Sequence, residues 1–216
     1  MSAAVDYPVS LAVEDFVPVL LTTVGVLLLR YIVPERRAVL AAAVLIGCGG
    51  TAKATAKLLA ATGHGDHAWL RGMLFPLLTL GFGLLCLILM RQGGRVPLWL
   101  RILVPGLVAV CTAGAVLSGD PIVFLVSTTV FATLAGIRLI GTARRHGDIV
   151  AASLFGLQLL VFFILGSLAS RPDQTVALQW GEQLSNTVAQ AAFAYAAWRL
   201  ATASQHPATD RTQETR

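Results

Sequence analysis

Seven long apolar runs, separated by short polar stretches, account for most of the chain. Each run is about 20 residues long, the length that an α-helix needs to cross the hydrocarbon core of a bilayer. Because backbone groups in lipid must be hydrogen-bonded within their own segment, the runs predict helices rather than strands. The seven predicted helices lie at 15–33, 37–62, 68–90, 98–117, 121–142, 149–170 and 175–201.

The polar connections between these runs are short and rich in glycine, proline and arginine. They predict one all-α integral membrane bundle without a second domain. We expect an extracytoplasmic tail at 1–14, a transmembrane domain at 15–202 and a disordered cytoplasmic tail at 203–216. The first 14 residues carry acidic but no basic side chains, so we do not expect them to be a cleaved signal peptide.

Arginine gathers at alternate ends of the predicted helices, which indicates their orientation. Basic residues concentrate on the cytoplasmic side of membrane proteins, so the richer side is assigned to the cytoplasm. This places the N-terminus outside and the C-terminus in the cytoplasm, in the plasma (inner) membrane of a prokaryote. The poorer side holds Arg71 and Arg171, and the richer side holds Arg30, Arg36, Arg37, Arg91, Arg95, Arg101, Arg138, Arg144, Arg145, Arg199, Arg211 and Arg216.

Composition agrees with a lipid environment. Of the 216 residues, 56% are hydrophobic and 12% charged, and the mean hydropathy is +0.76. A soluble chain of this size cannot bury so much apolar surface. The net charge of +5 does not indicate a nucleic-acid partner, because the basic residues are not clustered into one surface. Cys48, Cys86 and Cys111 fall within apolar runs and are interpreted as small buried residues rather than disulfides.

The only two lysines, Lys53 and Lys57, both fall in the second predicted helix. Residues four apart in a helix differ by about 40° around its axis, so the two lysines share a face. Gly47, Gly50 and Ala54 form an adjoining stripe of small residues, which lets another helix approach closely. Since ionisable groups within a membrane are costly and mark functional sites, we expect both lysines to face the interior.

The seventh predicted helix carries five polar residues within an arc of about 100°. These residues are Gln179, Glu182, Gln183, Asn186 and Gln190. Facing them toward lipid tails would carry a large free-energy cost, so they are expected to line an interior cavity or to bond with neighbouring helices. A further amide in the middle of the sixth helix, at position 158 (Gln158), is a candidate for the same cavity.

The lysines and Glu182 are predicted at similar depth. With a rise of 1.5 Å per residue, Lys53 lies about 13 Å, Glu182 about 10 Å and Lys57 about 7 Å from the outer ends of their helices. We therefore expect Glu182, interpreted as the only carboxylate within the membrane, to pair with one of the lysines. Two cations against one acid would leave a place for an anion from outside. The structural alternative is that one such pair only locks the second helix to the seventh.

The remaining polar residues of the predicted helices and loops are interpreted as structural rather than as binding residues. We expect the membrane hydroxyls to bond to their own helix backbone, and Pro76 and Pro105 to kink their helices. Arg71 is expected to anchor the interface, with a pair to Asp66 or a contact with Glu182 as alternatives. The hydroxyls concerned are Thr51, Ser127, Thr128, Thr129 and Thr133. The loop histidines near Asp66 are expected to be solvated rather than bound to metal.

Residues needed for several membrane chemistries are missing from the predicted helices. No histidine lies within an apolar run, which argues against a bis-histidine haem and against histidine-ligated membrane hydrolases. The seventh helix has no lysine for a retinal Schiff base, and a Ser–His–Asp arrangement has no histidine within the membrane. We predict no catalytic residue, no metal ligand and no cofactor.

The sequence thus predicts a small carrier that binds an anionic or carboxylate-bearing solute between the second and seventh helices. The predicted binding residues are Lys53, Lys57, Gln158, Gln179, Glu182, Gln183, Asn186 and Gln190, with Glu182 as counter-charge or proton acceptor. One alternative is a sensor or accessory subunit with a membrane-protein partner, and another is a lipid- or isoprenoid-modifying enzyme that uses Lys53 as a base. Expected partners are the lipid bilayer, the small anion, and a membrane protein or a second copy, but no nucleic acid.

Overall fold

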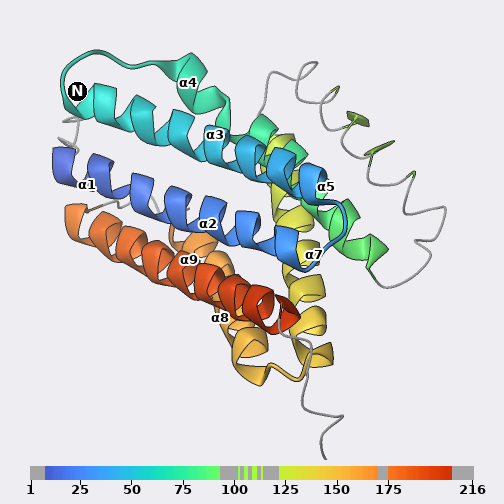
Figure 1. Ribbon diagram of the computed structural model, residues 1–216. Helices are drawn as coiled ribbons and strands as arrows, with labels where there is room; N and C mark the ends of the chain where they lie inside the picture. Colours follow the sequence, from blue (N-terminus) through green and yellow to red (C-terminus); the bar gives the residue numbers. More distant parts are fainter. Residues whose placement is uncertain are drawn as a thin grey trace, which may run out of the picture.

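The computed structural model describes residues 8–92, 122–169 and 175–205, together with isolated positions between 102 and 113. These ranges contain helices and turns but no strand. Most of the predicted helix at 98–117 lies outside the described residues, although isolated positions within it, Pro105 among them, are helical. Most of the predicted C-terminal tail also lies outside the described residues. In chain order the elements are α1 (Val9–Glu14), α2 (Phe16–Leu28), the 3-10 helix η1 (Leu29–Tyr31), α3 (Arg36–Ala61), α4 (Ala68–Gly72), α5 (Leu74–Arg91), α7 (Ile122–Arg145), α8 (Ile149–Ala169) and α9 (Val176–Gln205) (Figure 1).

Five segments of the described chain are long and apolar enough to cross a membrane. They are Val9–Tyr31, Arg36–Ala61, Ala68–Arg91, Ile122–Arg145 and Ile149–Gly166. The prediction of an all-α, multi-pass membrane protein in a lipid bilayer is therefore confirmed. The sixth long helix, α9, has 30 residues and is long enough to span, but its polar residues make it less apolar than the others.

Two helix boundaries differ from the prediction. The first helical segment begins at Val9 rather than at residue 15, because the carbonyl of Pro8 accepts the first helical hydrogen bonds. This extension brings Glu14 and Asp15 within the spanning segment. The third predicted helix is interrupted at Met73, between α4 and α5. Pro76 then falls in the first turn of α5, where its missing N–H leaves no intrahelical bond unmade.

The six long helices form a closed ring among the described residues. Around the ring α2 packs against α3, α3 against α5, α5 against α7, α7 against α8, α8 against α9, and α9 against α2. The predicted small-residue stripe lies at the contact between α3 and α2. A Cβ added at Gly50 would come within 2.7 Å of the Val19 side chain, and one at Gly47 within 2.9 Å of the Thr23 hydroxyl. The predicted close helix contact is confirmed there.

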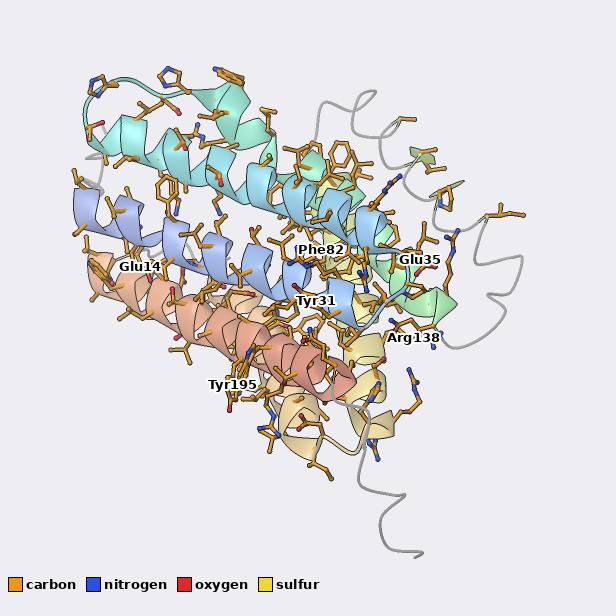
Figure 2. All side chains as sticks on the ribbon, in the orientation of Figure 1. Glu14, Tyr31, Glu35, Phe82, Arg138 and Tyr195 are labelled. Atoms are coloured by element: carbon orange, nitrogen blue, oxygen red, sulfur yellow. The ribbon has the colours of Figure 1, made fainter. Side chains whose placement is uncertain are left out.

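The two ends of the ring have different chemistry. Figure 1 shows the start of α1, the end of α3 and the start of α9 together at one end, which we call the α1 end. The opposite end, the arginine end, carries seven of the described arginines: Arg30, Arg36, Arg37, Arg91, Arg144, Arg145 and Arg199. Glu35 and Arg138 also lie toward the arginine end (Figure 2).

The main hydrophobic core fills the ring toward the arginine end. Its fully buried members come from every long helix, and they include Val26, Val39, Ile88, Leu139, Phe155, Ala197 and Leu200. Polar contacts also tie this end together. The Gln92 Nε2 donates to the Ile32 carbonyl at 2.7 Å, and Arg199 forms an ion pair with Asp148 at 3.0 Å. The arginine end is therefore closed by packing and by paired polar groups.

A polar cavity at the centre of the helix ring

A cavity of about 410 Å³ lies inside the helix ring. This volume falls within the range of small-molecule binding sites. All six long helices contribute to its wall. The polar and charged lining residues are Asp15, Thr22, Lys53, Lys57, Thr128, Gln158, Glu182, Gln183, Asn186 and Gln190. The ring thus encloses a space whose wall combines charges and amides with apolar side chains.

Of the eight residues predicted to bind a solute, the structure places seven around this one cavity. The exception is Gln179, one turn closer to the start of α9, which does not line the cavity. The Gln179 Oε1 is buried and has no hydrogen-bond partner among the described residues. Gln158 comes from α8, and the other lining residues of the predicted set come from α3 and α9. Their role in binding stays a prediction.

The expected ion pair between a lysine and Glu182 is wrong. Lys57 Nζ instead lies 2.6 Å from Asp15 Oδ2, and these side chains are only 27% and 12% exposed. The reason is the order of helices in the ring: α3 does not pack against α9, because α2 lies between them. Sequence reasoning missed Asp15 because it placed this residue at the outer edge of the first helix. The apolar residues from Val9 to Val13 were the signal that the helix begins earlier.

The expected excess of cations in the cavity is also wrong. Two lysines and two carboxylates line it, since Asp15 joins Glu182. A third membrane-level acid, Glu14, accepts a hydrogen bond from Thr187 in α9, and Figure 2 shows it between the α1 and α9 ribbons. Glu182 is therefore not the only carboxylate within the membrane. The formal charges of the cavity wall balance, although only one pair is in contact.

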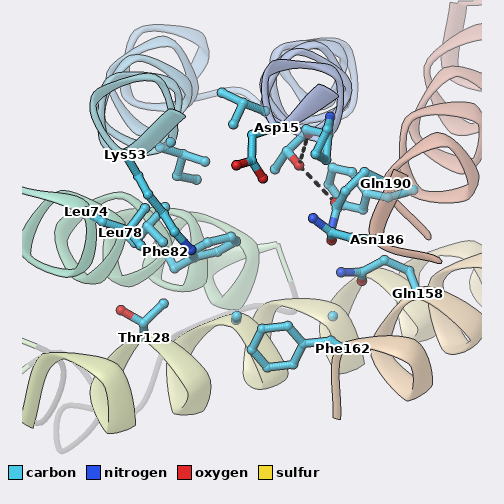
Figure 3. A pocket seen from close by; sticks show the side chains of 18 of the residues that line it. Asp15, Lys53, Leu74, Leu78, Phe82, Thr128, Gln158, Phe162, Asn186 and Gln190 are labelled. Atoms are coloured by element: carbon cyan, nitrogen blue, oxygen red, sulfur yellow. Dashed lines mark hydrogen bonds between the residues drawn. The ribbon is translucent and has the colours of Figure 1, made fainter. Parts of the chain in front are cut away.

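Lys53 and Glu182 are the two charges of the wall that do not pair. Lys53 makes neither an ion pair nor a hydrogen bond with any described residue, although Asp15 attracts it and Lys57 repels it. Figure 3 shows its side chain extending into the cavity beside Phe82. The Glu182 Oε1 is buried and has no hydrogen-bond donor within the described part of the chain. The cavity thus presents one cation and one anion that have no ion-pair partner among the described residues.

Amide groups form a short chain of hydrogen bonds on the opposite wall. The Thr22 hydroxyl lies 2.7 Å from the Pro18 carbonyl and 2.9 Å from Gln190 Oε1, so its single proton is shared between these two acceptors. Gln190 Nε2 donates to Asn186 Oδ1 at 3.3 Å. Because the Asn186 oxygen is already an acceptor, its amide nitrogen is left to donate elsewhere. The amide ends of Asn186 and Gln158 point into the same cavity as the Lys53 ammonium (Figure 3). Neutral donors therefore accompany the cation.

The side of the cavity toward the arginine end is apolar. Ile46, Leu85, Leu139 and Phe193 line it there and also belong to the packed core. The charged residues lie nearer the α1 end, since Lys53 is about 12 Å and Lys57 about 6 Å from the end of α3 at Ala61. The cavity therefore has a polar part toward the α1 end and an apolar floor that is part of the core.

The hydroxyl residues of α7 follow the prediction only in part. Ser127 and Thr129 donate to the carbonyls one turn earlier, at 2.7 and 2.9 Å, as expected. Thr128 instead contacts Thr79 of α5 at 2.9 Å, with both residues buried. Thr79 was not among the predicted polar contacts. Arg71 in α4 pairs at 2.7 Å with Asp66 of the preceding loop, which confirms one of the three interpretations of Arg71.

Comparisons with known proteins do not supply a function. No protein-family model, curated protein or solved structure matches this chain. The chemistry of the cavity is therefore the basis for a functional proposal.

Proposed function

We propose that the chain is a small carrier that takes a carboxylate-bearing solute into this cavity. In this proposal seven helices cross the plasma (inner) membrane, with the N-terminus outside and the C-terminus in the cytoplasm. The arginine end would then face the cytoplasm, in agreement with the distribution of basic residues. The α1 end, which is nearer the charged part of the cavity, would face the outside.

The observation that carries this proposal is the environment of Lys53. Its ammonium enters a cavity inside the helix ring and pairs with no described residue, whereas Lys57 is already neutralised by Asp15. Lys53 is accessible rather than sealed in packing, so a solute that enters the cavity can reach it, and a carboxylate on that solute would supply the missing partner. Asn186 and Gln158 would donate hydrogen bonds to the same carboxylate.

Transport requires the solute to leave toward the arginine end. The floor of the cavity is packed core, so this step requires Leu85, Leu139 and Phe193 to separate. Glu182 is the group on which we place proton coupling, since it lines the cavity without an ion-pair partner among the described residues. Movement of one part of the ring against the other around a central site is the usual form of alternating access.

The same packed floor supports a second candidate function. A protein that binds a solute as a signal, without releasing it on the cytoplasmic side, needs no route through the core. It would then be a sensor or an accessory subunit, with its arginine end against a membrane-protein partner or anionic lipid. Binding without flux, together with co-purification of a second protein, would favour this function over carriage.

The test uses the full-length protein in liposomes and in detergent, with labelled 3-phenylpropanoate as a carboxylate probe. We expect uptake above that of empty liposomes, and binding that Lys53→Gln weakens by on the order of tenfold or more, because a charged hydrogen-bonded contact is lost. Lys57→Gln should also change binding, and Glu182→Gln should slow uptake, because it removes the group on which we place proton coupling. Arg71→Gln is the matched control, since its exposed pair with Asp66 lies outside the cavity. Binding that is unchanged in all three cavity variants overturns the proposal.

A further inference from the structure

Two opposite charges face the cavity from helices that are not neighbours in the ring. Lys53 lies on α3 and Glu182 on α9, and both line the cavity. In the ring α2 separates these helices (Figure 1). The acid that could have served Lys53 from α2, Asp15, is held by Lys57 at 2.6 Å. Neither Lys53 nor Glu182 has an ion-pair partner among the described residues.

A solute with one charged group could pair with Lys53 or with Glu182, but not with both. A simple carboxylate would neutralise Lys53 and add a negative charge to a cavity that already contains Glu182. In a low-dielectric interior an unpaired acid and its repulsion by a second anion both disfavour that complex. A solute that also carries a cationic group would compensate both charges at once.

We infer that the solute is a zwitterion, with its carboxylate at Lys53 and its ammonium group at Glu182. This inference rests on the proposed function and narrows it to amino-carboxylate solutes. Asn186 and Gln158 add neutral donors on the carboxylate side, where their amide ends meet the cavity (Figure 3). The Glu182 Oε1, buried and without a donor among the described residues, is free to accept from an ammonium group.

The remainder of the wall suits an apolar side chain. Phe82, Leu78 and Phe162 line the cavity between the charged residues and the core, and Figure 3 shows the Phe82 and Phe162 rings bordering it. The volume of about 410 Å³ is in the range that holds a small organic molecule. An amino acid with an apolar body therefore fits the lining better than a short polar one.

The experiment compares three ligands that share one apolar body. Phenylalanine carries both charged groups, 3-phenylpropanoate lacks the ammonium group, and phenethylamine lacks the carboxylate. Their affinities are measured by calorimetry on the purified full-length protein in detergent. We expect phenylalanine to bind on the order of tenfold more tightly than 3-phenylpropanoate, because it gains one charged hydrogen-bonded contact. Phenethylamine should bind most weakly, since Lys53 then stays unpaired.

Two variants assign each end of the ligand. Glu182→Gln should lower the affinity for phenylalanine to that for 3-phenylpropanoate, and should leave the latter unchanged or slightly stronger. Lys53→Gln should weaken both carboxylates and leave phenethylamine unaffected. Ser185→Ala is the control on α9, because Ser185 is exposed and lies within one turn of Glu182 but outside the cavity lining.

The outcomes separate this inference from the function on which it rests. If 3-phenylpropanoate binds through Lys53 and phenylalanine binds no better, the solute is a simple carboxylate, so the zwitterion is wrong and the proposed function stands. If phenethylamine binds best, or if none of the three binds, both proposals are overturned. The comparison on the unmodified protein needs no variant, so a folding defect in Glu182→Gln or Lys53→Gln cannot obscure the result.

Discussion

The two ends of the helix ring differ in how their polar and charged side chains are satisfied. At the arginine end, alanine, leucine and phenylalanine side chains pack into a continuous core, and Asp148 pairs with Arg199. Toward the α1 end, two lysines, two carboxylates and four amides face a cavity. Within the part of the chain that the structure describes, Lys57 and Asp15 are the only two of those charges that form an ion pair. Unsatisfied polar groups are expensive within a bilayer. Their concentration in one half of the ring indicates that this half binds something, while the other half holds the helices together.

The largest expected difference between the halves is in stability. Phe155 is fully buried in the core at the arginine end, whereas Phe162, two turns along α8, lines the cavity. Phe155→Ala should lower the free energy of unfolding by about 3–5 kcal/mol, because it leaves a hole in close packing. Phe162→Ala should cost distinctly less, since its ring already borders open space. Denaturant unfolding in detergent micelles measures both, and equal losses would contradict the division into a packed and a binding half.

A second test breaks the one satisfied pair in the cavity. Asp15→Asn should destabilise the protein by about 1–3 kcal/mol, because it leaves Lys57 charged and only partly solvated. The double variant Asp15→Asn with Lys57→Gln should recover most of that loss, since the uncompensated charge is gone. The same unfolding measurement on the four proteins of this cycle gives the coupling between the two side chains. Additive losses would show that the pair contributes nothing to stability.

The sequence predicts the helices of this protein better than it predicts their neighbours. The length of an apolar run and the helical period are local properties of the sequence. They predict where a helix spans the membrane, and they place Lys53 on the inward face of α3 and Asn186 and Gln190 on the inward face of α9. Partners across the ring depend on the order in which the helices pack. That order places α2 between α3 and α9, and no single-helix pattern contains this information. The Lys57–Asp15 pair was therefore missed, and Glu182 was assigned a partner that it does not contact.

The start of the first helix shows a second limit of local patterns. Glu14 and Asp15 make the chain polar just where the predicted span begins, so the pattern favours a tail before residue 15. In the structure the helix continues back to Val9, because these acids find partners in other helices: Thr187 for Glu14 and Lys57 for Asp15. Tertiary contacts thus stabilise charged residues at a depth where the local pattern disfavours them.

A smaller effect concerns the ion pair at the arginine end and its pH dependence. Burial raises the pKa of Asp148, but hydrogen bonds from Arg199 and from the Ala151 backbone N–H outweigh it and hold the pKa below its usual value. A carboxyl group whose pKa is lowered by folding stabilises the protein above its unfolded pKa, and this contribution is lost as the pH falls through the folded value. The Asp148–Arg199 contact should therefore be fully present at neutral pH and disappear in acid.

Asp148→Asn tests this contact. It keeps a side-chain oxygen that can accept from Ala151 N, a contact of 2.9 Å at the start of α8, and it removes the charge opposite Arg199. We expect a loss of about 1 kcal/mol at neutral pH that shrinks toward zero as the pH falls through the lowered pKa of Asp148, because the aspartate itself is then protonated. Unfolding midpoints are compared across pH, with Asp66→Asn as the control for the exposed pair with Arg71. A loss that does not depend on pH would assign the effect to capping rather than to charge.

The smallest expected effect on stability concerns the hydrogen-bonded chain of Thr22, Gln190 and Asn186. The same variant also tests whether this chain contributes to ligand affinity. Thr22→Val removes the hydroxyl that is shared between the Pro18 carbonyl and Gln190 Oε1 and keeps the shape of the side chain, so stability should fall by only about 1 kcal/mol. Gln190 then loses the contact that fixes its orientation. Once the Gln190 amide can turn, its Nε2 no longer stays bonded to Asn186 Oδ1. If Asn186 binds the carboxylate through its nitrogen, affinity for 3-phenylpropanoate should drop by about threefold to tenfold, because the amide can then rotate. Thr23→Val is the matched control, since that hydroxyl donates only to the Val19 carbonyl on its own helix. Equal binding by both variants would mean that Asn186 needs no contact with α2 for its orientation. The packed contacts that fix side chains would then stop at the apolar floor of the cavity.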